Sequence, residues 1–167
     1  AGNALDNILM GTDGVNVLDG GDGADTLDGR GGNDTLIGGQ GVDTYLFGYG
    51  SGADLVEDTY LTESDVIQMH SDIRPSDVTV HNMSDSDLVL RLQGSLDSLT
   101  VSRFFQGLEY RRKEVRFADG TVWDAATLES LAQPPQPIGL VLVGGHGGET
   151  LTGGEGNDRL SGYGGDD

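Results

Sequence analysis

The sequence predicts a mainly all-β protein in which two repeat blocks flank an antiparallel β module with one short helix. Two observations support this prediction: a nine-residue period in the glycine-rich segments, and an alternation of polar and apolar residues between them. Of the 29 glycines, 15 lie in the first segment, 3 in the middle and 11 in the last. The predicted parts are residues 1–54 (first repeat block), 55–133 (β module), 134–139 (proline-rich linker) and 140–167 (start of a second, truncated block).

The net charge excludes two classes of partner. The 167 residues include 28 acidic and 9 basic side chains, which gives a formal charge of −19. Nucleic acids and anionic membranes are themselves polyanions, so we expect the chain to bind neither. The absence of cysteine excludes disulfides and thiolate metal sites. No apolar run is long enough to span a bilayer and no cleavable signal peptide opens the chain, so we expect a soluble protein that attracts cations.

The glycine-rich segments contain a repeat of nine residues. From Gly2 the chain reads GNALDNILM, GTDGVNVLD, GGDGADTLD, GRGGNDTLI and GGQGVDTYL. The eighth position is always apolar and is held by Leu9, Leu18, Leu27, Leu36 and Tyr45. The sixth position always carries a short side chain with an oxygen: Asn7, Asn16, Asp25, Asp34 and Asp43. The pattern returns near the end of the chain, where the sixth positions are Glu149, Asp158 and Asp167.

This pattern resembles the G-G-x-G-x-D-x-U-x nonapeptide of RTX (repeats-in-toxin) proteins, the haemolysin-type calcium-binding repeat. The resemblance implies a parallel β-roll that binds several Ca²⁺ ions between its turns. It also implies a bacterial protein that a type I secretion system exports to the extracellular space or the cell surface. Such export needs no N-terminal signal, which agrees with the start of this sequence.

The same repeat can be interpreted physically. In each nonapeptide six residues form a turn and three form a short strand, and two nonapeptides complete one coil. Equivalent turns then lie 18 residues apart, so Asp25 faces Asp43 and Asn16 faces Asp34. Two carboxylates and several backbone carbonyls form an oxygen cage suited to Ca²⁺, which takes ~6–8 oxygens. Because the core is thin and facing acids repel, we expect folding to require the metal; the alternative is a flexible linker, expected where such a composition has no period.

The predicted ligands depart from the repeat at several positions. Asn7 and Asn16 are neutral, so we expect the first sites to bind more weakly. Asp54 follows Asp34 by 20 residues instead of 18, which predicts an irregular last turn that still closes a site. Glu149 is one methylene longer than Asp, which puts its cage in doubt. The turn glycines predicted to line the sites are Gly11, Gly14, Gly20, Gly21, Gly23, Gly29, Gly31, Gly32, Gly38, Gly39, Gly41, Gly144, Gly145, Gly162 and Gly164.

The middle segment alternates polar and apolar residues at period two. This predicts strands over residues 65–70, 77–83, 87–93 and 99–105. Asp119-Gly120 predicts a two-residue hairpin turn. Asp124 is the expected N-cap of a helix over residues 125–132, with Leu128 and Leu131 on one face. The expected core anchors are Phe104, Phe105, Phe117 and Trp123.

Two stretches of this segment, DVTVHNMSDSDLVLRL and VRFADGTVWDAATL, are similar to the haemolysin-type calcium-binding protein-related domain. The similarity implies no known chemistry. A physical role is to cap the first roll by covering its last coil and pairing its exposed strand edges.

Other motifs in the sequence do not indicate a further binding or catalytic site. The aspartates of the first block lack the bidentate Glu of an EF-hand. His70, His81 and His146 lack the spacing of a zinc site, and no Ser-His-Asp group can be assembled, so we expect no enzyme. Arg111, Arg112 and Lys113 are interpreted as a solvated, ion-paired face rather than a basic binding patch.

The leading hypothesis is a Ca²⁺-binding structural module of a secreted RTX protein, such as an adhesin, that folds on Ca²⁺ outside the cell. Its partners are calcium ions and further domains of the parent, because the chain ends at Asp167 in the middle of a repeat. The alternative is a non-catalytic secretion or stability segment of an exported RTX enzyme or toxin. A third hypothesis gives the middle segment its own ligand, a carbohydrate or a protein.

Overall fold

The computed structural model describes residues 1–57, 64–83, 86–107, 110–132, 141–143 and 159–161. Residues 1–134 form one compact unit and residues 135–167 a second. Strands dominate the described residues, with parallel and antiparallel pairs and a short α-helix, so the predicted all-β class is confirmed. None of the described residues belongs to a helix long and apolar enough to cross a membrane.

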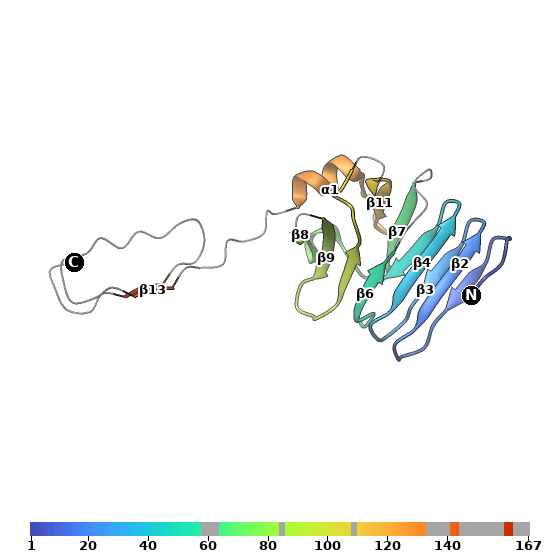
Figure 1. The fold of residues 1–167 in the computed structure, drawn as a ribbon, viewed down its shortest axis with the longest axis horizontal. Helices are drawn as coiled ribbons and strands as arrows, with labels where there is room; N and C mark the ends of the chain where they lie inside the picture. Colours follow the sequence, from blue (N-terminus) through green and yellow to red (C-terminus); the bar gives the residue numbers. More distant parts are fainter. Residues whose placement is uncertain (58–63, 84–85, 108–109, 133–140, 144–158, 162–167) are drawn as a thin grey trace. The chain divides into compact units, whose positions relative to one another are not determined.

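The first unit consists of two six-stranded sheets (Figure 1). In spatial order, the first sheet contains β1 (Ile8–Met10), β3 (Thr26–Asp28), β5 (Thr44–Phe47), β7 (Asp65–Met69), β11 (Lys113–Arg116) and β12 (Val122–Trp123). The second sheet contains β2 (Val17–Asp22), β4 (Thr35–Gln40), β6 (Ala53–Val56), β10 (Ser98–Val101), β9 (Asp87–Leu92) and β8 (Val78–Met83). Up to β7 the chain alternates between the two sheets, as a roll requires.

The strand register confirms that two nonapeptides form one coil. β1 pairs in parallel with β3 through Ile8 and Thr26, and the equivalent backbone positions are 18 residues apart. Later coils are longer, with separations of 20 residues between β4 and β6 and 22 residues between β5 and β7. The roll therefore keeps its stacking even where the repeat has lost its period.

The middle segment continues both sheets of the roll. β7 pairs in parallel with β5 and β11, and β10 pairs in parallel with β6, whereas β8, β9 and β12 pair only antiparallel. The predicted antiparallel pairing is therefore present for β8, β9, β10 and β12, whereas β7 and β10 pair in parallel with the open edges of the roll. β7 and β10 pair with β5 and β6, the last strand of the roll in each sheet, which is the arrangement that a cap would have.

One continuous core runs through the unit. Leu27, Leu36 and Tyr45 of the roll are fully buried, and their cluster extends to Phe104 and Phe117 of the middle segment. The core anchors predicted from the sequence form two edge-to-face pairs, Phe104 with Phe105 and Phe117 with Trp123. Phe105 and Trp123 are only partly buried and pack against this cluster.

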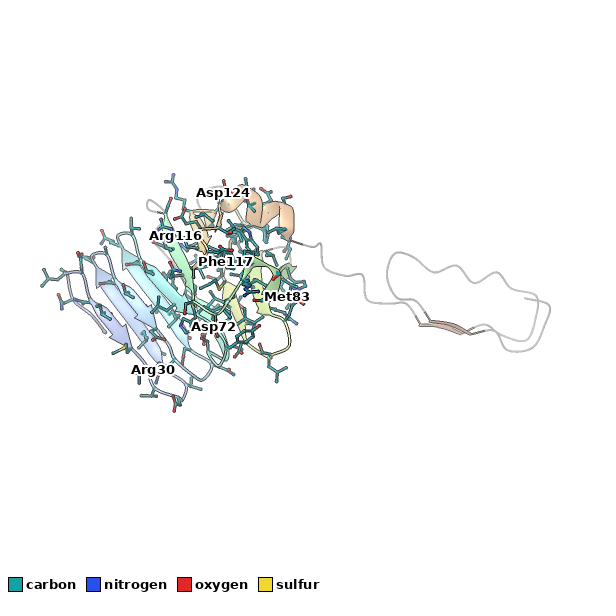
Figure 2. The ribbon with its side chains drawn as sticks, turned by 180° about the vertical axis from the view of Figure 1, so that it is seen from behind. Arg30, Asp72, Met83, Arg116, Phe117 and Asp124 are labelled. Carbon is teal, nitrogen blue, oxygen red and sulfur yellow. The ribbon has the colours of Figure 1, made fainter. Side chains whose placement is uncertain are left out.

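A short helix, α1 (Ala125–Leu131), lies at the end of the unit opposite to β1 (Figure 1). The Oδ1 atom of Asp124, labelled in Figure 2, accepts a hydrogen bond from the Thr127 backbone N–H at 2.8 Å, which confirms the predicted N-cap. Leu128 is buried, but Leu131 in the last turn is 39% exposed. The helix ends at Leu131, so this residue adds little to the core.

Two local predictions in the middle segment need correction. The strand expected over residues 99–105 ends at Val101, because the chain turns and Arg103 adopts a φ of 60°. The hairpin between β11 and β12 has a three-residue loop, closed by a hydrogen bond from the Phe117 N–H to the Thr121 carbonyl at 2.9 Å. Gly120 takes the left-handed conformation with a φ of 89°, which suits the third residue of such a loop. A 3₁₀ turn, η1 (Pro75–Asp77), precedes β8.

The second unit contains a parallel pair, β13 (Val141–Val143) and β14 (Arg159–Ser161). Leu142 pairs with Leu160, which repeats the coil length of the first block. The predicted ligands of this block lie outside the described residues: Glu149, Asp158, Asp167, Gly144, Gly145, Gly162 and Gly164.

Candidate metal centre

The sixth-position side chains form two rows along the edges of the roll. We call the first, on the side of the first sheet, row A; its members are Asn7, Asp25, Asp43 and Asp65. We call the second row B; its members are Asn16, Asp34 and Asp54. Each of these residues lies at or directly before the start of a strand, with Asp54 the second residue of β6, so the in-register stacking of strands also stacks the side chains.

A ladder of hydrogen bonds connects the members of each row. In row A, Oδ1 of Asp25 accepts the Asn7 N–H at 2.7 Å, and Oδ1 of Asp43 accepts the Asp25 N–H at 2.8 Å. In row B, Oδ1 of Asp34 accepts the Asn16 N–H at 2.7 Å, and Oδ1 of Asp54 accepts the Asp34 N–H at 2.9 Å. The predicted pairings, including that of Asp54 across the irregular turn, are therefore present.

The second carboxylate oxygens of two row members are buried without a hydrogen bond. Asp25 is 1% exposed and Asp34 is 2% exposed, and Oδ2 of each has no hydrogen-bond partner among the described residues. Burying a carboxylate without a partner is costly, because the charge loses its hydration and gains nothing in return. These two oxygens therefore favour a cation at the turns.

The turn glycines create the space in which these oxygens lie. A Cβ on Gly20 would collide with Oδ2 of Asp25 and with the carbonyl oxygen of Gly38. Gly39 has a φ of 108°, and a Cβ there would collide with the carbonyl oxygen of Gly21 in the preceding coil. Carbonyl and carboxylate oxygens thus approach the backbone at positions where only glycine leaves room.

This set of donors fits Ca²⁺. It consists of carboxylate and carbonyl oxygens, which hard divalent cations prefer. No three His, Asp or Glu side chains gather around one point in the described ranges, so turn carbonyls have to complete each coordination shell. Between the second and third coils, the ligands would be Asp25 and Asp43 with the carbonyl oxygens of Gly21 and Gly23. A Ca²⁺ ion bound there would balance the charges of Asp25 and Asp43.

The two asparagines differ from the aspartates in their contacts. Oδ1 of Asn7 accepts the Asn3 N–H at 2.7 Å, and Oδ1 of Asn16 accepts the Thr12 N–H at 2.5 Å. Their side-chain oxygens are therefore used within their own turns. Gly14 also departs from the other predicted glycines, because a Cβ there would meet only Oγ1 of Thr12, at 3.9 Å. Weaker binding at the first sites stays a prediction.

Asp54 ends row B in an unfavourable environment for a negative charge. Burial raises the pKa of Asp54 to about 7, the Asp34 N–H lowers it, and the charges of Asp34, Asp97 and Asp28 raise it further. A nearby cation would stabilise the charged form of a carboxyl group whose pKa is raised in this way. The end of row B therefore fits the predicted metal position.

The comparison with known families agrees with this geometry. Residues 2–36, 10–45 and 143–167 match the RTX calcium-binding nonapeptide repeat. The chain carries RTX repeats. Residues 87–127 match the haemolysin-type calcium binding protein related domain, while no curated protein matches the chain. The RTX repeats of this chain bind Ca²⁺ at several sites, as predicted.

Asp65, the last acid of row A, was not predicted from the sequence as a site residue. Its Oδ1 accepts the Asp43 N–H at 2.9 Å, as in the RTX coils before it. A signal was present in the sequence, because Asp65-Val66-Ile67 repeats the Asp-x-apolar triplet of Asp43-Thr44-Tyr45. The period was hidden, since 22 residues separate the two aspartates.

Asp97 is a second residue near the rows that was not predicted from the sequence. Its carboxylate accepts the N–H groups of Gly50 and Gly52 at 3.0 and 2.7 Å, which fixes the irregular turn before Asp54. Burial raises the pKa of Asp97, but the hydrogen bonds from Gly50, Gly52 and Ser95 outweigh it and leave the pKa below its usual value.

The predicted solvated face at residues 111–113 is only partly correct. Arg111 pairs with Glu129 at 2.8 Å, and this contact is partly exposed. Lys113 is instead buried and pairs with Asp65 at 2.6 Å. The reason is the period-two alternation of β11, which directs Lys113 and Val115 inward while Arg112 and Arg116 are exposed.

Proposed function

We propose that this chain is a non-catalytic structural module of a secreted protein, and that Ca²⁺ outside the cell drives folding of its RTX blocks. One observation carries the proposal: the Oδ2 atoms of Asp25 and Asp34 are buried without a hydrogen bond among the described residues. A buried charge without a counter-ion destabilises a fold by several kcal/mol. The roll is therefore disfavoured without metal and stabilised when Ca²⁺ occupies the rows.

The proposed coupling of folding to location rests on charge. With a formal charge of −19, the metal-free chain repels itself, which favours an expanded state at low Ca²⁺. RTX repeats are typical of secreted bacterial proteins, which supports export of the chain before it folds. Extracellular calcium modules bind with dissociation constants of roughly 10⁻⁴–10⁻³ M. With a folding midpoint in that range, the chain would be unfolded at the low Ca²⁺ concentration inside the cell and folded outside it.

The middle segment is proposed to act as the cap of the roll rather than as a separate binding domain. Phe104 and Phe117 are buried in the common core and are not available for a ligand. A surface cavity of about 210 Å³ beside this segment is lined by polar and charged residues of 111–114 and by Ser64, Asp124 and Ala125. Its lining contains no aromatic side chain on which a carbohydrate could stack.

A calcium titration of the whole chain tests the proposal. The chain is freed of metal with a chelator and titrated with Ca²⁺, with far-UV circular dichroism to follow β structure and calorimetry to count ions. We expect a cooperative gain of β signal with several ions bound, and no such gain with Mg²⁺. Folded repeats in chelator, or no uptake of Ca²⁺, would contradict metal-driven folding. A folding midpoint below ~10⁻⁷ M would contradict the coupling to export, because sites of that affinity serve inside cells.

A further inference from the structure

Row A ends at a cation that belongs to the chain itself. The Nζ atom of Lys113 lies 2.6 Å from Oδ2 of Asp65, and the two side chains are 4% and 3% exposed. The other oxygen of Asp65 accepts the Asp43 N–H at 2.9 Å. Asp65 therefore binds the preceding coil with one oxygen and an ammonium group with the other.

Lys113 occupies the row position that aspartate holds in the earlier coils. In the parallel pair of β7 and β11, Lys113 is the direct partner of Asp65, and Val115 is the partner of Ile67. The triplet Lys113-Glu114-Val115 thus follows the Asp-x-apolar pattern with the charge reversed. Lys113 is also the single lysine of the chain.

The sequence that leads to Asp65 lacks the glycines that make room for an ion in the earlier turns. Residues 57–64 contain no glycine, whereas the turn before Asp43 contains Gly38, Gly39 and Gly41. In the earlier coils those glycines allow carbonyl and carboxylate oxygens to approach the backbone closely. An ammonium group carried by a side chain needs no such turn, because its own three N–H groups provide the contacts.

We propose that Lys113 is a built-in cation that closes row A, so that the chain's own charge, and not calcium, neutralises Asp65. The proposal rests on the proposed function, in which Ca²⁺ neutralises the earlier intervals of the row. Row B ends differently, because the strand partner of Asp54 in β10 is the apolar Leu99. The two rows therefore differ in their last interval: the strand partner is a cation in row A and an apolar residue in row B.

Charge-removing variants test the pairing. The variants are Lys113→Met, Asp65→Asn and the double variant, with Arg116→Met as the matched control on the exposed face of the same strand. Met keeps the length of the lysine stem but lacks the ammonium group, with its charge and its N–H donors. In saturating Ca²⁺ we expect each single variant to lower the Tm by about 10 °C, because each removes one partner of a buried ion pair. The double variant should recover most of this loss, and Arg116→Met should change the Tm by less than about 3 °C.

The number of bound ions separates a built-in cation from a calcium ligand. By calorimetry, the double variant should bind as many Ca²⁺ ions as the unmodified chain, whereas Asp25→Asn should bind fewer. Loss of an ion in the double variant would overturn the proposal, because Asp65 would then be a calcium ligand. An unchanged Tm for Lys113→Met would also overturn it.

Two further outcomes are decisive. If Lys113→Met does not fold, the double variant carries the test, and failure of the double variant to fold would overturn the charge-compensating role. If the unmodified chain binds no Ca²⁺, the proposed function fails, but the Tm values of the four variants still measure whether Lys113 and Asp65 depend on each other.

Discussion

The backbone N–H of Asp25 donates a hydrogen bond of 2.8 Å to Oδ1 of Asp43, which lies 18 residues further along the chain. Row A repeats this contact between Asn7 and Asp25. One carboxylate oxygen thus links a turn to the next coil. In Asp25 the other oxygen has no hydrogen bond within the described residues and is available to a cation. The sixth position of the repeat therefore serves both coil stacking and metal binding.

Asp25→Asn separates these two roles. The amide keeps the size of the side chain and an oxygen that can accept the Asn7 N–H, but it removes the charge. We expect the affinity for the affected ion to fall roughly 10- to 100-fold, as is typical when one charged hydrogen-bonding ligand is lost. Calorimetry should detect this as a missing high-affinity ion, and the Tm in Ca²⁺ should fall.

Asp19→Asn is the control for this prediction. Asp19 lies on β2 and is exposed, so the variant removes the same charge at a site outside the rows. Its ion count should equal that of the unmodified chain. Equal losses in both variants would mean that net charge, and not position in the row, governs binding.

The roll could be predicted because one short period fixes several properties at once. Nine-residue spacing places Leu27 and Tyr45 inward and Asp25 and Asp43 at the turns, without any long-range information. The ion pair of Asp65 with Lys113 could not be predicted in this way. Its partners are 48 residues apart, and only the strand pairing of β7 with β11 brings them together.

The middle segment shows the limit of alternation as a signal. Alternating residues predicted that β7 and β10 exist, but alternation is the same for parallel and antiparallel strands. Their direction comes from the edges of β5 and β6, which the roll leaves open. The end of a strand likewise depends on the local backbone conformation. β10 ends at Val101, and Arg103, two residues later, has a φ of 60° that does not fit a strand.

Gly39→Ala should destabilise the roll strongly. The residue has a φ of 108°, and a Cβ there would collide with the carbonyl oxygen of Gly21, which is backbone and cannot move aside alone. The left-handed conformation alone costs roughly 1–2 kcal/mol for a non-glycine residue, so we expect a loss of at least about 2 kcal/mol. Chemical denaturation in saturating Ca²⁺ measures it.

Gly14→Ala is the matched control in the first block. Gly14 does not have a positive φ, and the nearest atom to its added Cβ is Oγ1 of Thr12 at 3.9 Å. We expect its free energy of unfolding to change by less than about 0.5 kcal/mol, as at an ordinary surface site. A loss as large as that of Gly39→Ala would show that crowding of the turn is not the cause.

Arg30→Gly should stabilise the roll, in contrast to Gly39→Ala. Arg30 holds the second position of its nonapeptide, where Gly21 and Gly39 stand in other coils, and it adopts a φ of 65°. Its side chain is exposed at the edge of the roll (Figure 2). Glycine removes the strain of this conformation but raises the entropy of the unfolded chain, so we expect a net gain of up to about 1 kcal/mol. Denaturation in Ca²⁺ checks it, and a loss of stability would contradict the prediction.

His81 provides a test of electrostatics in the cap. Burial lowers the pKa of His81 below its ordinary value of 6.5, and the positive charge of Arg91 lowers it further. The folded state therefore binds fewer protons at this ring than the unfolded state. The resulting stability is present above pH 6.5 and is lost as the pH falls from 6.5 through the lower pKa of the folded state.

Arg91→Gln should raise the pKa of His81 toward its ordinary value without reaching it, because burial remains the larger cause. An NMR titration of the imidazole ring in the Ca²⁺-loaded chain measures this shift directly. Arg116→Gln is the control, since it removes the same charge from the other sheet. A folded-state pKa of His81 at or above 6.5 in the unmodified chain would contradict the burial of this ring. A shift of equal size in both variants would mean that the net charge of the protein, and not the neighbouring guanidinium, sets the pKa.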